Sequence, residues 1–69
     1  MSIVAGNVKR IMNDRGLKQY SVAKQSGIAE KTFSNMLNGR KIVSEMDIIR
    51  MAGALGVEPN ELFARQESA

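Results

Sequence analysis

Residues 19–38 read QYSVAKQSGIAEKTFSNMLN, and apolar side chains gather on a helical face at each side of Gly27: Val22 and Ala23 before it, Phe33, Met36 and Leu37 after it. This periodicity predicts two short helices joined by a sharp turn. Gly27 has no Cβ, so it can take the positive φ angle that ends the first helix and redirects the chain. Ala23 is small enough for the second helix to cross close to the first. The segment is therefore predicted to be a helix-turn-helix.

Other pieces of the chain continue the same pattern: GLKQ at 16–19, NGRK at 38–41, ALGV at 54–57 and ELF at 61–63. In this order they resemble the DNA-binding domains of the phage Cro and cI-type repressor family (lambda-repressor-like, XRE-type) from about Val8 to Phe63. The resemblance implies an all-α fold, a compact five-helix lambda-repressor-like domain with its helix-turn-helix at helices two and three.

Glycines also mark where helical patterns stop, at Gly16, Gly27, Gly39 and Gly56. Ser44 and Asp47 resemble a capping box, and Pro59 suits a first helical position. The helices are expected at Ser2–Arg15, Lys18–Ser26, Ala29–Asn38, Ser44–Leu55 and Pro59–Arg65. Residues 1–69 form one domain at this length, with 66–69 expected to be a loose tail.

The apolar periodicity predicts one core made from all five helices. Its expected members are Val8, Ile11, Met12, Leu17, Val22, Ala23, Ile28, Phe33, Met36, Leu37, Ile48, Met51, Ala52, Leu55, Val57, Leu62 and Phe63. The 69 residues contain no cysteine and no histidine. We therefore expect no metal site, no cofactor and no catalytic residues. A small-molecule ligand is not expected either.

Charge is divided unevenly along the chain. Residues 1–41 hold eight basic side chains against two acidic ones, and residues 42–69 hold two against five. A basic face on a small helical protein favours a polyanionic partner, although an ordinary solvated charge pattern remains the alternative on charge alone.

The resemblance implies that helix 29–38 reads double-stranded DNA in the major groove. The residues at its matching positions are Glu30, Lys31, Thr32 and Asn35. These side chains can pair with cytosine, guanine and adenine edges or touch thymine methyl groups. A plain alternative for Glu30 is that an anion is favoured at a helix N-terminus.

Contacts to DNA phosphates are implied for Gln19, Asn38, Arg40 and Lys41, the last three through cations and backbone N–H groups of their loop. Two residues depart from the family pattern, because Ala29 and Lys18 stand where capping side chains are usual. Loss of one such cap costs about 1 kcal/mol.

Relatives pair two reading helices about 34 Å apart on DNA. A self-complementary dimer patch is expected at Val43, Met46, Ile49, Val57 and Pro59, apolar residues that are not all needed for the core. The sequence thus predicts a Cro-like regulator, a repressor rather than an enzyme, that binds a near-palindromic operator as a weak homodimer. The alternative is an antitoxin-like protein-interaction module with DNA binding secondary. No membrane span or leader is expected, so the location predicted is the cytoplasm of a bacterial host, with the nucleoid.

Overall fold

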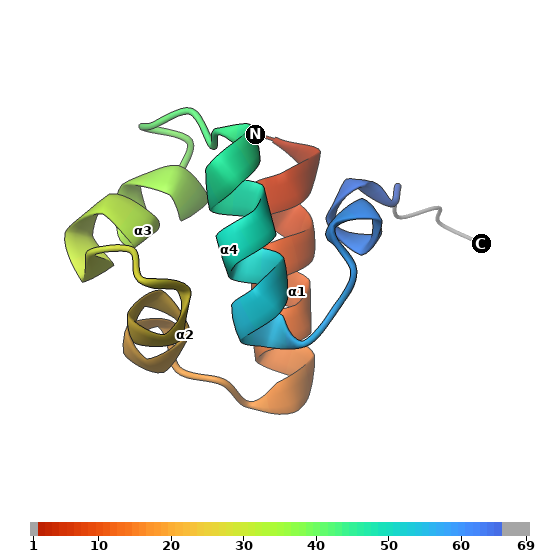
Figure 1. The fold of residues 1–69 in the computed structure, drawn as a ribbon, viewed down its shortest axis with the longest axis horizontal. Coiled ribbons are helices and arrows are strands. Elements are labelled where there is room, and N and C mark those ends of the chain that lie inside the picture. Colours follow the sequence, from red (N-terminus) through yellow and green to blue (C-terminus); the bar gives the residue numbers. More distant parts are fainter. Residues whose placement is uncertain (1, 66–69) are drawn as a thin grey trace.

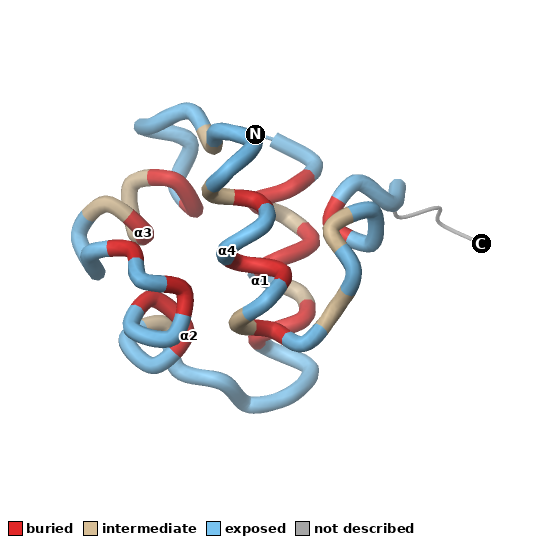
Figure 2. Tube along the Cα trace, in the orientation of Figure 1, coloured by how far each residue is buried: buried red, intermediate tan, exposed pale blue. Residues whose placement is uncertain are grey.

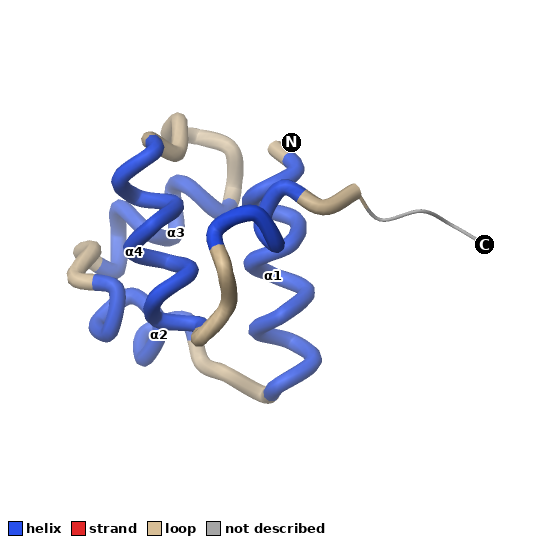
Figure 3. Tube along the Cα trace, turned by 45° about the vertical axis from the view of Figure 1, so that its right-hand side comes forward, coloured by secondary structure: helices blue, strands red, loops and turns tan. Residues whose placement is uncertain are grey.

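The computed structural model describes residues 2–65, and this part of the chain folds into helices with no strand (Figure 1). Four α-helices are followed by one short 3-10 helix: α1 (Ile3–Arg15), α2 (Gln19–Ser26), α3 (Glu30–Leu37), α4 (Glu45–Leu55) and η1 (Pro59–Phe63). Short loops join them (Figure 3). None of the helices is long and apolar enough to cross a membrane.

Local capping explains where α1 and α4 begin. The Ser2 hydroxyl accepts a hydrogen bond from the Ala5 N–H at 3.0 Å, and the Ser44 hydroxyl accepts one from the Asp47 N–H at 3.2 Å. The Asp47 carboxylate accepts in return from the Ser44 N–H at 3.0 Å. The predicted capping box is confirmed, and it satisfies N–H groups that have no partner inside the helix.

The core lies where α1, α2, α3 and α4 face one another, with η1 packed on α1 and α4 (Figure 2). Phe33, Val8 and Leu62 are fully buried at its centre. Two predicted core residues were wrong: Leu17 is 38% exposed and Phe63 is 55% exposed. Both lie at or beyond the end of a helix, where helical periodicity no longer determines which way a side chain points. Val57 is half-buried at the edge of the core.

The expected fifth helix is not an α-helix and does not reach Arg65. Residues 59–63 form a 3-10 helix, in which the Glu61 N–H donates to the Glu58 carbonyl at 2.9 Å. The chain then turns extended at Ala64. The end of η1 and Ala64 are held against α1, because the carbonyls of Leu62 and Ala64 accept hydrogen bonds from the Asn7 side chain. The tail expected at 66–69 lies outside the described residues.

Candidate nucleic-acid interface

The turn between α2 and α3 has the geometry that the glycine spacing predicts. Gly27 has φ = 75°, and its N–H donates to the Lys24 carbonyl at 3.2 Å. The Ile28 N–H donates to the Ala23 carbonyl at 3.1 Å, which completes a Schellman motif. Ala23 and Ile28 are both buried. These two apolar side chains lie in the core that α2 and α3 share, so the direction in which α3 leaves the turn is set by packing as well as by the glycine.

Helix α3 has one buried face and one uncovered edge. Phe33, Met36 and Leu37 are buried. The four residues predicted to read bases lie on the remaining surface: Glu30 and Lys31 are exposed, and Thr32 and Asn35 are half-buried. In Figure 1 α3 lies on the opposite side of the molecule from η1, at one edge of the bundle. Glu30 and Lys31 are therefore open to a partner on this edge, and Thr32 and Asn35 are partly open to it.

The loop after α3 is tied closely to the end of that helix. The main-chain carbonyl of Asn35 accepts from the N–H groups of both Arg40 and Lys41, at 2.8 Å and 3.2 Å. The N–H groups of Asn38 and Gly39 donate to the carbonyls of Ser34 and Met36, and Gly39 has φ = 76°. This corrects one expectation from the sequence, because none of these four N–H groups remains available to a phosphate.

Side chains are the groups that this loop can still offer. Asn38, Arg40 and Lys41 are exposed, and the Asn38 amide donates one long, exposed hydrogen bond of 3.4 Å to the Ser34 hydroxyl. Gln19, the first residue of α2, is half-buried. Because the Asn35 carbonyl holds the N–H groups of Arg40 and Lys41, the backbone that carries the two cations is fixed relative to the end of α3.

The basic side chains of the first 41 residues separate into two groups. Arg15 donates to the Leu55 carbonyl at the end of α4, and Arg10 pairs with Asp14 on the surface of α1 at 3.5 Å. A second group is exposed and forms no ion pair within residues 2–65: Lys9, Lys18, Lys24, Lys31, Arg40 and Lys41. Five of these six belong to α2, α3 or the loops that flank them, and Lys9 lies on α1. Most of the unpaired positive charge of residues 2–41 is therefore on the helix-turn-helix side of the domain.

The N-termini of α2 and α3 have no side-chain caps, unlike those of α1 and α4. Lys18 and Ala29 occupy the capping positions and accept no hydrogen bond from the first turn. This outcome follows from the residue types, since neither side chain carries an acceptor. Both uncapped starts belong to the helix-turn-helix.

The residues expected to form a dimer patch differ in exposure. Met46 and Ile49 are 55% and 47% exposed, whereas Val43, Val57 and Pro59 are half-buried. Two exposed members of this apolar surface were not predicted from the sequence: Phe63, which is 55% exposed, and Ile42, which is 90% exposed. Phe63 had been assigned to the core because it follows Leu62, and Ile42 follows two cations in a loop where periodicity gives no signal.

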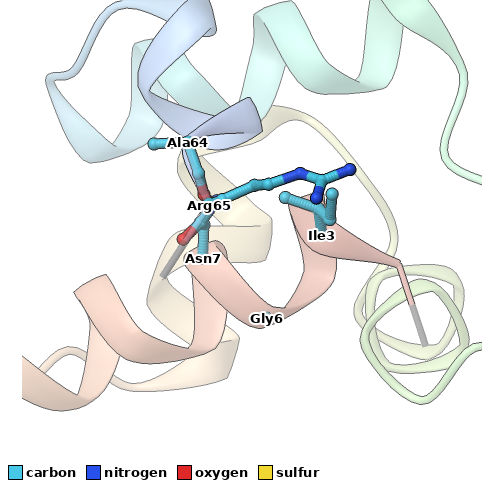
Figure 4. Close-up of a pocket in the computed structure, with 5 residues that line it drawn as sticks. All are labelled: Ile3, Gly6, Asn7, Ala64 and Arg65. Carbon is cyan, nitrogen blue, oxygen red and sulfur yellow. The ribbon is translucent and has the colours of Figure 1, made fainter. Parts of the chain in front are cut away.

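Asn7 is a buried polar residue that the sequence reading also missed. Its side chain is 1% exposed, and its amide nitrogen donates to the carbonyls of Leu62 at 2.8 Å and Ala64 at 2.7 Å. Figure 4 shows it beside Ala64 and Arg65, at a hollow of about 380 Å³ between α1 and the segment after η1. Its burial could have been predicted from its position, because Asn7 lies three residues after Val4 and four before Ile11 on the buried face of α1.

Comparison with known proteins agrees with this geometry. Residues 7–68 match the family model of the Cro/C1-type HTH DNA-binding domain. The chain is 32% identical over 60 residues to y4dJ, an uncharacterised HTH-type transcriptional regulator of Sinorhizobium fredii (strain NBRC 101917 / NGR234). The aligned residues cover 87% of this chain and 78% of that protein. The fold is similar to the crystal structure of the restriction-modification controller protein C.AhdI from Aeromonas hydrophila, with a TM-score of 0.83 and 30% sequence identity over 88% of this chain and 92% of that one. The resemblance to Cro and cI-type domains is confirmed, and the chain belongs to the Cro/C1-type HTH family of DNA-binding transcriptional regulators, which is not a class of enzymes.

Proposed function

We propose that this protein is a Cro-like transcriptional repressor that binds a specific double-stranded operator with α3 in the major groove. The observation that carries the proposal is the division of α3 into a buried apolar face and an uncovered polar edge. A major groove is about 12 Å wide and admits one α-helix. A short helix held at the edge of the bundle by its apolar face can enter the groove with its polar edge first.

Four side chains of this edge are assigned to base recognition. Asn35 can pair bidentately with adenine, Lys31 can donate to guanine acceptors, and Glu30 can accept from the cytosine amino group. Thr32 offers a hydroxyl and a methyl group. Lys31 and Asn35 lie four residues apart on one side of the helix, so together they suit neighbouring base pairs.

Phosphate contacts are assigned to Gln19 at the start of α2 and to the side chains of Asn38, Arg40 and Lys41 after α3. Such contacts supply affinity and register but no sequence information. Two further features support a phosphate on this side: the exposed cations of the helix-turn-helix and the uncapped starts of α2 and α3. A docked phosphate would accept from N–H groups that have no side-chain partner.

A single reading helix covers too few base pairs for a unique operator, so we assign a weak homodimer on a near-palindromic site. The apolar surface of α4 and η1 supports this assignment, because Met46 and Ile49 project from α4 with about half of their surface exposed. Ile49→Asp is expected to weaken operator binding while leaving the monomer folded. Unchanged operator affinity in this variant would remove the patch from the interface.

The test begins with random duplex DNA titrated at several salt concentrations. Binding that is weak and falls steeply with salt is expected, because phosphate neutralisation releases counterions. Selection from a random-sequence library would then give the operator. On that operator, Asn35→Ala should relax preference at one base position by about 1–3 kcal/mol.

Arg40→Ala is the informative contrast. It should weaken binding to all DNA sequences alike and should lower the slope of log affinity against log salt concentration by about one unit. Lys9→Ala is a matched control: it removes an exposed cation of α1, outside the helix-turn-helix, and should change neither quantity much. Base preference that survives Asn35→Ala, or a salt slope equally sensitive to Lys9 and Arg40, would contradict the assigned interface.

The second candidate is an antitoxin-like module whose main partner is another protein. The 90% exposed Ile42 and the 55% exposed Phe63 favour it, since both lie in one apolar region outside the helix-turn-helix. The same titration separates the two functions: no affinity for random duplex DNA at low salt would favour the protein-interaction module. Under either function we place the protein in the cytoplasm of a bacterial host.

A further inference from the structure

The apolar surface of α4 and η1 contains two hollows that share a wall. The first, of about 320 Å³, is lined by Lys41, Ile42 and Val43 among others, and the second, of about 530 Å³, by Glu45, Ile49 and Pro59. Ile48 and Phe63 line both hollows. The two hollows therefore form one furrow, with Phe63 standing at its middle.

The side chains of this furrow combine projections with depressions. Phe63 is 55% exposed between the two hollows, and Ile42 projects at the rim of the first one. If a two-fold axis passes through Phe63, the aromatic rings of two copies meet at the axis, and the first hollow of each chain faces the second hollow of the other. Isologous contacts of this kind are the commonest in homodimers.

Charge is arranged with opposite signs on the two sides of Phe63. Lys41 lines only the first hollow and Glu45 lines only the second. Both are exposed, and neither forms an ion pair within the part of the chain that the structure describes. Each hollow is thus lined by one charged side chain that forms no ion pair within residues 2–65.

A two-fold axis in the plane of the contact can cross the furrow or run along it. If it crosses the furrow at Phe63, Lys41 of each chain faces Glu45 of the other. If it runs along the furrow, each charge faces its own copy, and like charges placed opposite one another are unfavourable. Charge complementarity therefore distinguishes the two arrangements.

We infer that a second copy of this chain docks in the furrow with the axis crossing it at Ile48 and Phe63, so that two Lys41–Glu45 pairs form between the chains. The inference rests on the homodimer of the proposed function and deepens it by specifying the register. The pairs select the orientation, while the apolar furrow supplies most of the affinity.

The test is charge reversal, with the dimer dissociation constant measured by sedimentation equilibrium without DNA, because Lys41 also belongs to the proposed phosphate contacts. Lys41→Glu and Glu45→Lys should each weaken the dimer roughly tenfold in low salt, since exposed ion pairs contribute a factor of about two to five each and two pairs are reversed. The double reversal should restore the affinity to within a factor of about three. High salt should remove most of the difference in dimer dissociation constant between each single variant and the wild type.

Lys9→Glu is the control for net charge, because it makes the same change on the exposed surface of α1. Glu45→Gln is a milder second variant in case a cation at the first residue of α4 destabilises that helix; it removes both ion pairs without adding repulsion and should weaken the dimer about fourfold or more. Circular dichroism would verify that each variant is folded.

Ile49→Asp separates failure of the register from failure of the dimer. If this variant abolishes dimerisation while the charge variants behave like wild type, the dimer stands and the proposed register is overturned. A double reversal no better than the single ones would also overturn the register. A wild-type chain that remains monomeric both at high concentration and on its operator would overturn the dimer and the register together.

Discussion

Replacement of Asn7 by Ala should destabilise the folded chain more than the same replacement of Asn13, the other asparagine of α1. The Asn7 amide nitrogen donates to two main-chain carbonyls, those of Leu62 and Ala64, which lie 55 and 57 residues further along the chain. These bonds join α1 to η1 and to the residue that follows η1. Their loss should free η1 from α1 while leaving the helix-turn-helix in place.

The magnitude follows from the geometry of the two bonds. Each bond between neutral groups contributes about 0.5–1.5 kcal/mol net, so the pair contributes about 1–3 kcal/mol. Leu62 is fully buried, whereas Ala64 is exposed, so water can replace the lost donor more easily at Ala64 than at Leu62. We expect a loss of about 2–3 kcal/mol in the free energy of unfolding. For 69 residues the total is on the order of 3–10 kcal/mol, so this loss is a large fraction of it.

The assay is urea unfolding followed by circular dichroism at 222 nm, with Asn13→Ala as the matched control. Asn13 lies in the same helix, is exposed and makes no side-chain hydrogen bond to any residue from 2 to 65, so its replacement should change the free energy of unfolding by less than about 0.5 kcal/mol. Equal losses in the two variants would refute the reasoning, since helix propensity alone would then explain both.

A second variant, Asn7→Asp, tests the same bonds through pH. An ionised carboxyl would face two carbonyl oxygens and donate to neither, so burial and repulsion should raise its pKa in the folded state above the unfolded value. A group with a raised folded pKa stabilises most at low pH and loses that contribution as pH rises through the folded pKa. Relative to wild type at each pH, this variant should therefore be less stable at pH 7 than at pH 4. A difference that does not change with pH would contradict the position assigned to the side chain.

Three further changes test other parts of the fold. Gly53→Ala should raise the free energy of unfolding by about 1 kcal/mol, because Gly53 lies inside α4 and a Cβ there would meet no atom within 4 Å; a loss of stability in urea unfolding would contradict this. Gly27→Ala should lower the free energy of unfolding by about 1–2 kcal/mol, because a side chain is strained at φ = 75°. An unchanged urea midpoint would show that the turn tolerates another conformation. Ala29→Ser should stabilise the DNA-free protein by about 1 kcal/mol by capping α3, measured as a rise in the urea midpoint, and no rise would mean that the α3 start is already satisfied.

Helix positions and most of the core were predictable from the sequence because the interactions that set them are local. A serine cap acts over three residues, as Ser44 does with Asp47, and a helix-ending glycine acts within its own turn, as Gly27 does. The buried face of α3 follows from the spacing of Phe33, Met36 and Leu37 along the helix. The base-reading and phosphate residues were placed by resemblance to a family, and the DNA contacts assigned to them stay predictions.

What the sequence determined by itself was the order of the helices, the ends of the four α-helices to within a residue or so, and the polar edge of α3, since each depends on neighbours a few residues apart. Only the tertiary structure decided that Phe63 faces outward, that η1 is a 3-10 helix and that Asn7 holds it. These features depend on contacts between the two ends of the chain, and side-chain spacing carries no information about partners more than 50 residues away. The furrow around Phe63 exists for the same reason, because α4, η1 and the loop after α3 form it only when they are packed together.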